Sequence, residues 1–237
     1  MNPVPTDKKR AKTTPVSQGL FVGGTLAALV ISVVLITLGS FSSREPEITL
    51  PPTSSTSAVI AYGTSFGAPN APITMVIYSD FQCHFCQEFA LGIEKQLEAT
   101  YVAEGKVRMV YKHIVAYGDE SQLAAEASEC ASEQNQFWPY HDLLMGLRLS
   151  NSKADLTSEK LIDLARQLGL DVDKFTASLT SGKFTAKVKQ ESDEGMDLGF
   201  TNLPKFYFNG VVADDSIGKS FENFQAVIDA ELARLEK

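Results

Sequence analysis

The sequence predicts an α/β domain that carries an inserted block of helices and is preceded by one transmembrane helix. A long apolar stretch without charge near the N-terminus predicts the membrane helix. The β-branched and aromatic run Ile73 to Tyr78 predicts a buried strand that leads directly into the motif Cys83-His84-Phe85-Cys86 and a helical pattern. A further strand pattern, Lys205 to Phe208, comes only after a long helical stretch, which makes that stretch an insertion between strands.

The N-terminal region divides into a polar tail (1–19), a predicted transmembrane helix (20–41) and a Ser-, Thr- and Pro-rich linker (42–57). No charged residue occurs from Thr13 to Ser43, and roughly 20 apolar residues suffice to cross a bilayer. The alternative is a cleaved signal peptide, but its apolar region is usually only about 7–15 residues long. Basic side chains in the tail keep the N-terminus cytoplasmic, so domain 58–237 is expected outside, where disulfides persist.

Composition narrows the classes of function. Hydrophobic residues make up 44% and charged residues 21%, as in an ordinary globular protein. The net charge is −8, and since residues 7–12 carry +3, the rest of the chain carries −11. An acidic chain does not have the basic footprint of a nucleic-acid-binding protein, so no nucleic acid is expected as a partner. Three cysteines are too few for a disulfide-stapled scaffold.

Within the domain, apolar spacing and capping residues predict the remaining elements. One continuous helix is expected from Cys86 through Tyr101, because apolar residues recur three and four apart. The all-α insertion spans about 119–199. The other expected strands are an edge strand at Ala58–Tyr62, a buried strand at Val107–Tyr111 and a hairpin of Lys205–Phe208, Asn209-Gly210 and Val211-Val212. The expected helices are Ser121–Ser132, Phe137–Leu147, one capped by Thr157, one opened by Asp171 and Asp173, Phe184–Leu198 and Ser220–Leu235.

The cysteine pair lies where a strand passes into a helix. Unpaired N–H groups and the helix dipole at such a junction stabilise a thiolate on Cys83. Because Cys86 follows three residues later, the two can also close into a disulfide, which is the chemistry of dithiol–disulfide exchange. A structural disulfide is the lesser alternative, because so small a loop constrains little chain.

Half of a zinc site is the other alternative for the cysteine pair. Zinc takes about four ligands, and the chain offers no second C-x-x-C. The remaining ligand stock is Cys130, His84, His113 and His141. We expect Cys130 to be a buried core thiol and His113 and His141 to be structural, so no metal and no cofactor are expected.

Several motifs together resemble one family. They are Gly67 to Pro72, Ser79-Asp80-Phe81-Gln82-Cys83 with Phe85-Cys86, Glu126 to Ala131, Gln136 to Asp142, and Leu203 to Gly210. These segments resemble the DsbA-like thiol:disulfide oxidoreductases of the thioredoxin superfamily, from about Gly67 to the C-terminus. The resemblance implies a thioredoxin fold with a helical insertion.

The resemblance also implies roles for site residues. Cys83 would be the exposed nucleophile that forms a mixed disulfide, and Cys86 would resolve it. His84 and Phe85, between them, would tune the pair, since a His84 cation stabilises a thiolate. The Leu203–Pro204 bond would be cis and face the pair, with the Leu203 backbone free to pair with an extended substrate. An ordinary trans turn proline is the alternative.

The chain departs from the family in three places. The dipeptide between the cysteines is His-Phe, where relatives often carry Pro after the first cysteine. Ile77 stands where many relatives have a buried acidic residue. Leu203 stands where Thr or Val is common. The first two bear on the direction of redox exchange, and the third bears on substrate preference.

These features predict a membrane-anchored, extracytoplasmic thiol:disulfide oxidoreductase that introduces disulfides into exported proteins and is reset by a membrane redox partner. A reductase or isomerase with the same site is an alternative, as is a non-catalytic peptide- or metal-binding module. The oxidant direction follows from the helix terminus at a partly exposed Cys83, the His84 cation and the absence of a carboxylate at Ile77. We expect a Cys83 pKa well below about 8.5 and a potential above roughly −200 mV.

Overall fold

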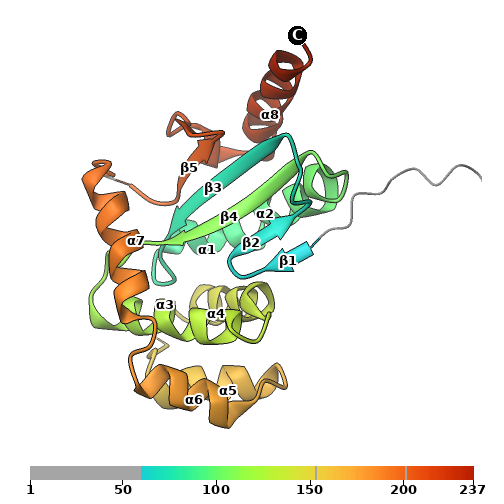
Figure 1. Ribbon diagram of the computed structural model, residues 1–237. Coiled ribbons are helices and arrows are strands. Elements are labelled where there is room, and N and C mark those ends of the chain that lie inside the picture. Colours follow the sequence, from blue (N-terminus) through green and yellow to red (C-terminus); the bar gives the residue numbers. More distant parts are fainter. Residues whose placement is uncertain (1–59, 153, 201) are drawn as a thin grey trace, which may run out of the picture. The chain divides into compact units, whose positions relative to one another are not determined.

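A six-stranded sheet in the order β1-β2-β4-β3-β5-β6 forms the centre of the computed structural model (Figure 1). The structure describes residues 60–152, 154–200 and 202–237. The strands are β1 (Ile60–Tyr62), β2 (Ser65–Gly67), β3 (Ile73–Ser79), β4 (Val107–His113), β5 (Lys205–Phe208) and β6 (Val211–Val212). Of these, β2 is absent from the sequence-based prediction, because three residues with no alternating pattern give no strand signal.

The two central strands, β3 and β4, are parallel, and every other pairing in the sheet is antiparallel. Their register aligns Ile73 with Val107 at one end and Ser79 with His113 at the other. Side chains of β4 alternate between buried and half-buried, while β3 is more deeply covered. A strand buried on both faces accounts for the near-continuous apolar sequence of β3.

The connection from β3 to β4 contains α1 (His84–Leu91), α2 (Ile93–Leu97) and a π-helical turn at Glu98–Val102. The prediction of one continuous helix here is wrong, because the helix breaks at Gly92. The Gly92 backbone, at φ −116° and ψ −83°, is not helical. A Cβ at this position would meet the carbonyl oxygen of Glu88 at 2.9 Å, so the break favours glycine.

Five helices lie between β4 and β5 and form the predicted all-α insertion (Figure 1). They are α3 (Asp119–Ser132), α4 (Phe137–Ser150), α5 (Ser158–Gln167), α6 (Val172–Thr180) and α7 (Thr185–Asp197). The predicted caps are present: Thr157 Oγ1 accepts from the Lys160 N–H, and Asp171 accepts from the Lys174 N–H. Each cap satisfies a backbone donor that the helix itself leaves free.

The chain ends with the β5–β6 hairpin, a 3₁₀ turn at Ile217–Lys219 and α8 (Phe221–Leu235). Positive φ values at Asn209 (49°) and Gly210 (83°) fit the predicted tight turn. In the core, Phe89 of α1, Phe206 of β5 and Phe224 of α8 pack with ring centroids 4.7–5.5 Å apart. This aromatic cluster fixes α1, and with it the cysteine motif, against one half of the sheet.

The predicted tail, transmembrane helix and linker (1–57) lie outside the described residues. Within the part of the chain that the structure describes, no helix has both the length and the apolar character needed to cross a membrane.

Candidate active site

Cys83 and Cys86 lie at the start of α1, directly after β3. Cys83 is the N-cap residue in an extended conformation, and its carbonyl accepts the Gln87 N–H at 3.1 Å. Both cysteines are free thiols. Cys83 is only 3% exposed and Cys86 is fully buried, so the expectation of a partly exposed Cys83 is wrong. Tertiary packing covers this cysteine, although it still lines a groove.

The two thiols have opposite electrostatic environments. A hydrogen bond from the Cys86 thiol, together with those from the Cys86 backbone N–H and the Tyr117 hydroxyl, lowers the Cys83 pKa to about 7. Burial and the Asp80 charge oppose this lowering of the Cys83 pKa. Burial and the Cys83 sulfur raise the Cys86 pKa well above its ordinary value. Near neutral pH, Cys83 is therefore the thiol of the pair that ionises more readily, and Cys86 remains protonated.

The dipeptide between the cysteines faces solvent. The His84 ring is 61% exposed, and its Nε2 lies 3.3 Å from Glu88 Oε1. Phe85 is 68% exposed and lines the groove beside Cys83. The tuning role assigned to His84 stays a prediction, because the contact of its ring nitrogen is with the exposed Glu88 and not with a cysteine.

Leu203 and Pro204 lie directly before β5, far from the cysteine pair in the sequence, and approach the pair in the fold. The Leu203–Pro204 bond is cis, as predicted. The Leu203 carbonyl oxygen lies 3.7 Å from Cys83 Sγ. Residues 120 positions apart in the sequence thus meet at one sulfur atom.

A groove of about 320 Å³ opens at Cys83. Its walls are mostly apolar and come from α1, the β4–α3 segment, the last turn of α7 and the segment after α7: Phe85, Ile114, Ala116, Tyr117, Met196, Phe200, Asn202 and Leu203. The groove therefore offers apolar surface directly beside the Cys83 sulfur.

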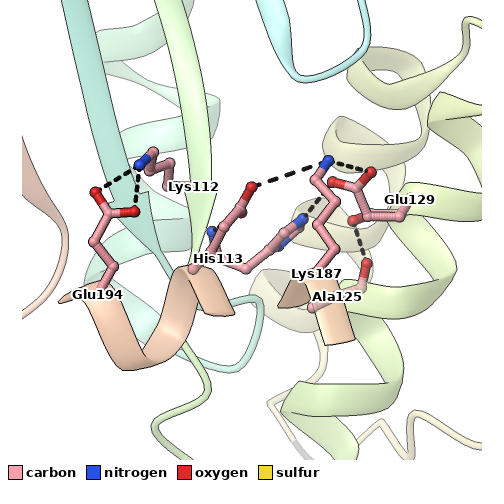
Figure 2. Close-up of polar contacts among 8 residues, drawn as sticks. Lys112, His113, Ala125, Glu129, Lys187 and Glu194 are labelled. Carbon is pink, nitrogen blue, oxygen red and sulfur yellow. Dashed lines mark hydrogen bonds and ion pairs between the residues drawn. The ribbon is translucent and has the colours of Figure 1, made fainter. Parts of the chain in front are cut away.

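Ion pairs dock the helical insertion onto the sheet near this groove. Figure 2 shows Lys112 of β4 facing Glu194 of α7, with Nζ 2.6 Å from Oε2. The next residue, His113, lies 3.0 Å from Glu129 Oε1 of α3, and Lys187 Nζ of α7 lies 2.6 Å from the other oxygen (Figure 2). Glu129 therefore joins the sheet, α3 and α7 through one buried carboxylate.

Backbone contacts strengthen the same junction. Glu191 Oε2 accepts the His113 N–H, and Ser192 Oγ accepts the Val115 N–H, both at 3.0 Å. A Cβ on Gly195 would overlap the side chain packed against it, so α7 approaches as closely as glycine permits. The C-terminal end of α7, which leads into the groove wall, is held rigidly against the end of β4.

Two residues near Cys83 escaped the sequence-based assignment. Asp80 is 1% exposed, and its charge acts on Cys83, so the pair does have a carboxylate neighbour although Ile77 is apolar. Position 77 is apolar as predicted, but Asp80 supplies a different buried carboxylate, whose charge opposes the Cys83 thiolate. Tyr117 lines the groove, and its hydroxyl lowers the Cys83 pKa. Asp80 was visible inside the cysteine motif, whereas Tyr117 lies in a loop with no sequence signal.

Three residues considered as possible ligands lie elsewhere among the described residues. His113 pairs with Glu129, and His141 is packed against Phe81 and other aromatic rings. Cys130 is buried on α3, and burial raises its pKa to about 12. The structure does not bring any of the three into the groove lining.

Comparison with known proteins gives consistent matches. A family model described as Thioredoxin matches residues 61–230. The probable disulfide bond formation protein D of Bacillus anthracis is 28% identical over 182 residues, which cover 74% of this chain and 82% of that protein. The Na(+)/H(+) antiporter NhaA 3 of Salinispora tropica is 32% identical over 146 residues, 61% of this chain but only 21% of the antiporter. The crystal structure of oxidised BdbD from Bacillus subtilis matches with a TM-score of 0.67 at 22% identity, covering 74% of this chain and 98% of that one. The predicted α/β fold with a helical insertion is confirmed.

Proposed function

The chain belongs to the thioredoxin family, and we propose that this DsbA-like thiol:disulfide oxidoreductase introduces disulfides into exported proteins through Cys83 and Cys86. The observation that carries the proposal is the divided pair itself. Cys83 has a lowered pKa and lines a groove, while Cys86 is buried behind it with a raised pKa. The similarity to a protein named for disulfide bond formation supports oxidation of client thiols as the direction of exchange.

The exchange proceeds in two balanced steps. A client thiolate attacks Cys83 Sγ of the oxidised pair, a mixed disulfide forms, and Cys86 leaves as a thiolate that takes up a proton. A second client thiolate then attacks the client sulfur of the mixed disulfide and releases Cys83 as a thiolate. The client gains one disulfide, and the pair gains two electrons. A low pKa makes Cys83 the better leaving group in the second step.

The groove supplies the binding part of this mechanism. An extended client segment would lie along Leu203 and Pro204, with its cysteine next to Cys83 and its apolar neighbours against walls such as Phe85. Because these walls contribute shape and apolar surface with few polar groups, they suit many client sequences.

The membrane assignments belong to the same proposal. The uncharged segment 20–41 would anchor the domain, the basic tail would stay cytoplasmic, and a membrane redox partner would reoxidise the pair. Protease added to intact spheroplasts should digest the domain and spare the tail. Protection of the domain would contradict the location.

The Cys83 pKa also favours a second candidate function, in which the protein reduces or isomerises disulfides. A Cys83 pKa of about 7 equals the value typical of thioredoxin, a reductant, and Asp80 opposes the thiolate. Equilibration with glutathione buffers separates the two. A potential above roughly −200 mV supports the oxidant, and one near −270 mV supports a reductase or isomerase.

The function itself is tested by trapping. A Cys86→Ser variant retains the nucleophile but lacks the resolving thiol, so it should accumulate mixed disulfides with exported proteins. A Cys83→Ser variant is the matched control and should trap none. A non-catalytic binding module would give no trapped clients with either variant, and its Cys83 would react slowly with alkylating agents.

A further inference from the structure

Asp80 joins two loops that meet at the groove. Its Oδ1 accepts from the Gln82 N–H at 2.7 Å, in the loop that leads to Cys83, and from Ser121 Oγ at 2.8 Å. Its Oδ2 accepts from the N–H of Ala116, the residue directly before Tyr117, at 2.7 Å. One buried side chain therefore fixes the segment before Cys83 to the segment after β4.

Tyr117 is the member of that second segment that reaches the reacting sulfur. Its side chain lines the groove together with Cys83, and its hydroxyl lowers the pKa of the Cys83 thiol. Burial and the Cys83 charge raise the Tyr117 pKa above its ordinary value, so the phenol stays protonated at neutral pH. It therefore acts as a hydrogen-bond donor to a thiolate, and no proton is transferred.

We propose that Tyr117 is a further catalytic residue, whose hydroxyl stabilises the Cys83 thiolate as it leaves the mixed disulfide, and that Asp80 is the positioning residue that holds Tyr117 there. This rests on the proposed function for its place in the reaction. A thiolate is a stronger hydrogen-bond acceptor than a disulfide sulfur, so a donor at this place favours the reduced pair over the disulfide. A hydrogen bond to a charged group is stronger than one between neutral groups, so this contact acts mainly on the thiolate.

The two residues act on Cys83 with opposite signs, and this makes the proposal testable. The Asp80 charge by itself raises the Cys83 pKa, whereas the Tyr117 hydroxyl lowers it. If Asp80 also holds Tyr117 in place, Asp80→Asn has two effects: it removes a repulsive charge and it loosens a stabilising donor. Only the second effect depends on the presence of the Tyr117 hydroxyl.

The first test is a titration of the Cys83 thiolate by its ultraviolet absorbance in the purified full chain. Tyr117→Phe should raise the Cys83 pKa by about one unit, a roughly tenfold weaker acid. Tyr62→Phe is the matched control, because Tyr62 is 75% exposed on β1 and lies outside the groove lining; it should leave the pKa unchanged. An unchanged Cys83 pKa in Tyr117→Phe would overturn the catalytic role.

The second test is a double-variant cycle with Asp80→Asn. In the Tyr117→Phe background, Asp80→Asn should lower the Cys83 pKa by the full effect of the lost charge. With Tyr117 present, Asp80→Asn should lower the Cys83 pKa by less, or raise it. Equal changes in both backgrounds would overturn the positioning role. If Asp80→Asn does not fold, Ser121→Ala retains the charge and removes one of the carboxylate's donors. It should raise the Cys83 pKa only when Tyr117 is present, and equal changes in the two backgrounds would again overturn positioning.

Failure of this inference differs from failure of the proposed function. The titration needs no client, so a shifted pKa together with no trapped clients would reject the function and retain the role of Tyr117 toward the thiolate. Normal trapping together with an unmoved pKa would reject only the role of Tyr117.

Discussion

Raising the pH through the Cys83 pKa should produce a bend in the redox potential of the pair. Below that pKa, reduction takes up two protons with two electrons, so the potential falls by about 59 mV per pH unit, twice the ~30 mV per tenfold change of a two-electron couple. Above it, Cys83 stays a thiolate and only Cys86 binds a proton, so the slope falls to about 30 mV. The structure places the bend near pH 7, because the Cys83 pKa is lowered from 9.0 to about 7.

The size of the thiolate's contribution follows from the same shift. With a pKa of about 7, half of Cys83 is ionised at pH 7, against about 1% at a pKa of 9.0. At pH 7 the lowered Cys83 pKa shifts the equilibrium toward the reduced pair by a factor of about two, which corresponds to ~9 mV in the potential. At pH 8 the factor is about ten, which corresponds to ~30 mV. The charge on Cys83 therefore explains little of the ~70 mV between thioredoxin and a potential of −200 mV. An oxidant would need further interactions that favour the dithiol.

The assay is equilibration with glutathione buffers from pH 5.5 to 9, with the reduced fraction counted by alkylation. A constant slope of about 59 mV up to pH 8.5 would refute the lowered Cys83 pKa. His84→Ala repeats the profile without the imidazole. A potential that falls would support a tuning role for His84, and an unchanged profile would assign the effect to the helix terminus and its neighbours.

Two further predictions concern the junction between the insertion and the sheet. Glu129→Gln should lower the free energy of unfolding by about 2–3 kcal/mol in guanidinium titrations, because it removes the buried carboxylate charge that pairs with His113 and Lys187. Asp193→Asn, in an exposed ion pair, is the control and should cost under about 1 kcal/mol. Burial raises the Glu129 pKa, but the hydrogen bonds and charges of its partners outweigh burial and lower it. The stabilisation from Glu129 is therefore complete above its unfolded pKa and is lost as pH falls through the lower folded pKa. A free energy of unfolding that does not change with acid would contradict this. Gly195→Ala should destabilise, because overlap with Ile114 costs about 1–3 kcal/mol and exceeds the roughly 1 kcal/mol gained in helix propensity; a more stable variant would show that α7 can move away.

Local sequence patterns determined much of the framework. The run from Ile73 onward is a strand because its residues are β-branched or aromatic, and Cys83 begins a helix because the apolar spacing changes there. Thr157 and Asp171 were readable as caps because a cap acts on a backbone donor only three residues away. Features such as these depend on near neighbours, so the sequence alone contains them.

The tertiary structure decided the environment of the reactive sulfur. Cys83 is buried because segments distant in the sequence cover it. Its pKa depends on Cys86, on Asp80 and on a tyrosine 34 positions away. No periodic pattern marks Tyr117, since its role depends on where the loop after β4 lies. A thiolate's stability is set by the charges and donors within a few ångströms of the sulfur, and the chain brings these together only when the sheet and its helical insertion have packed.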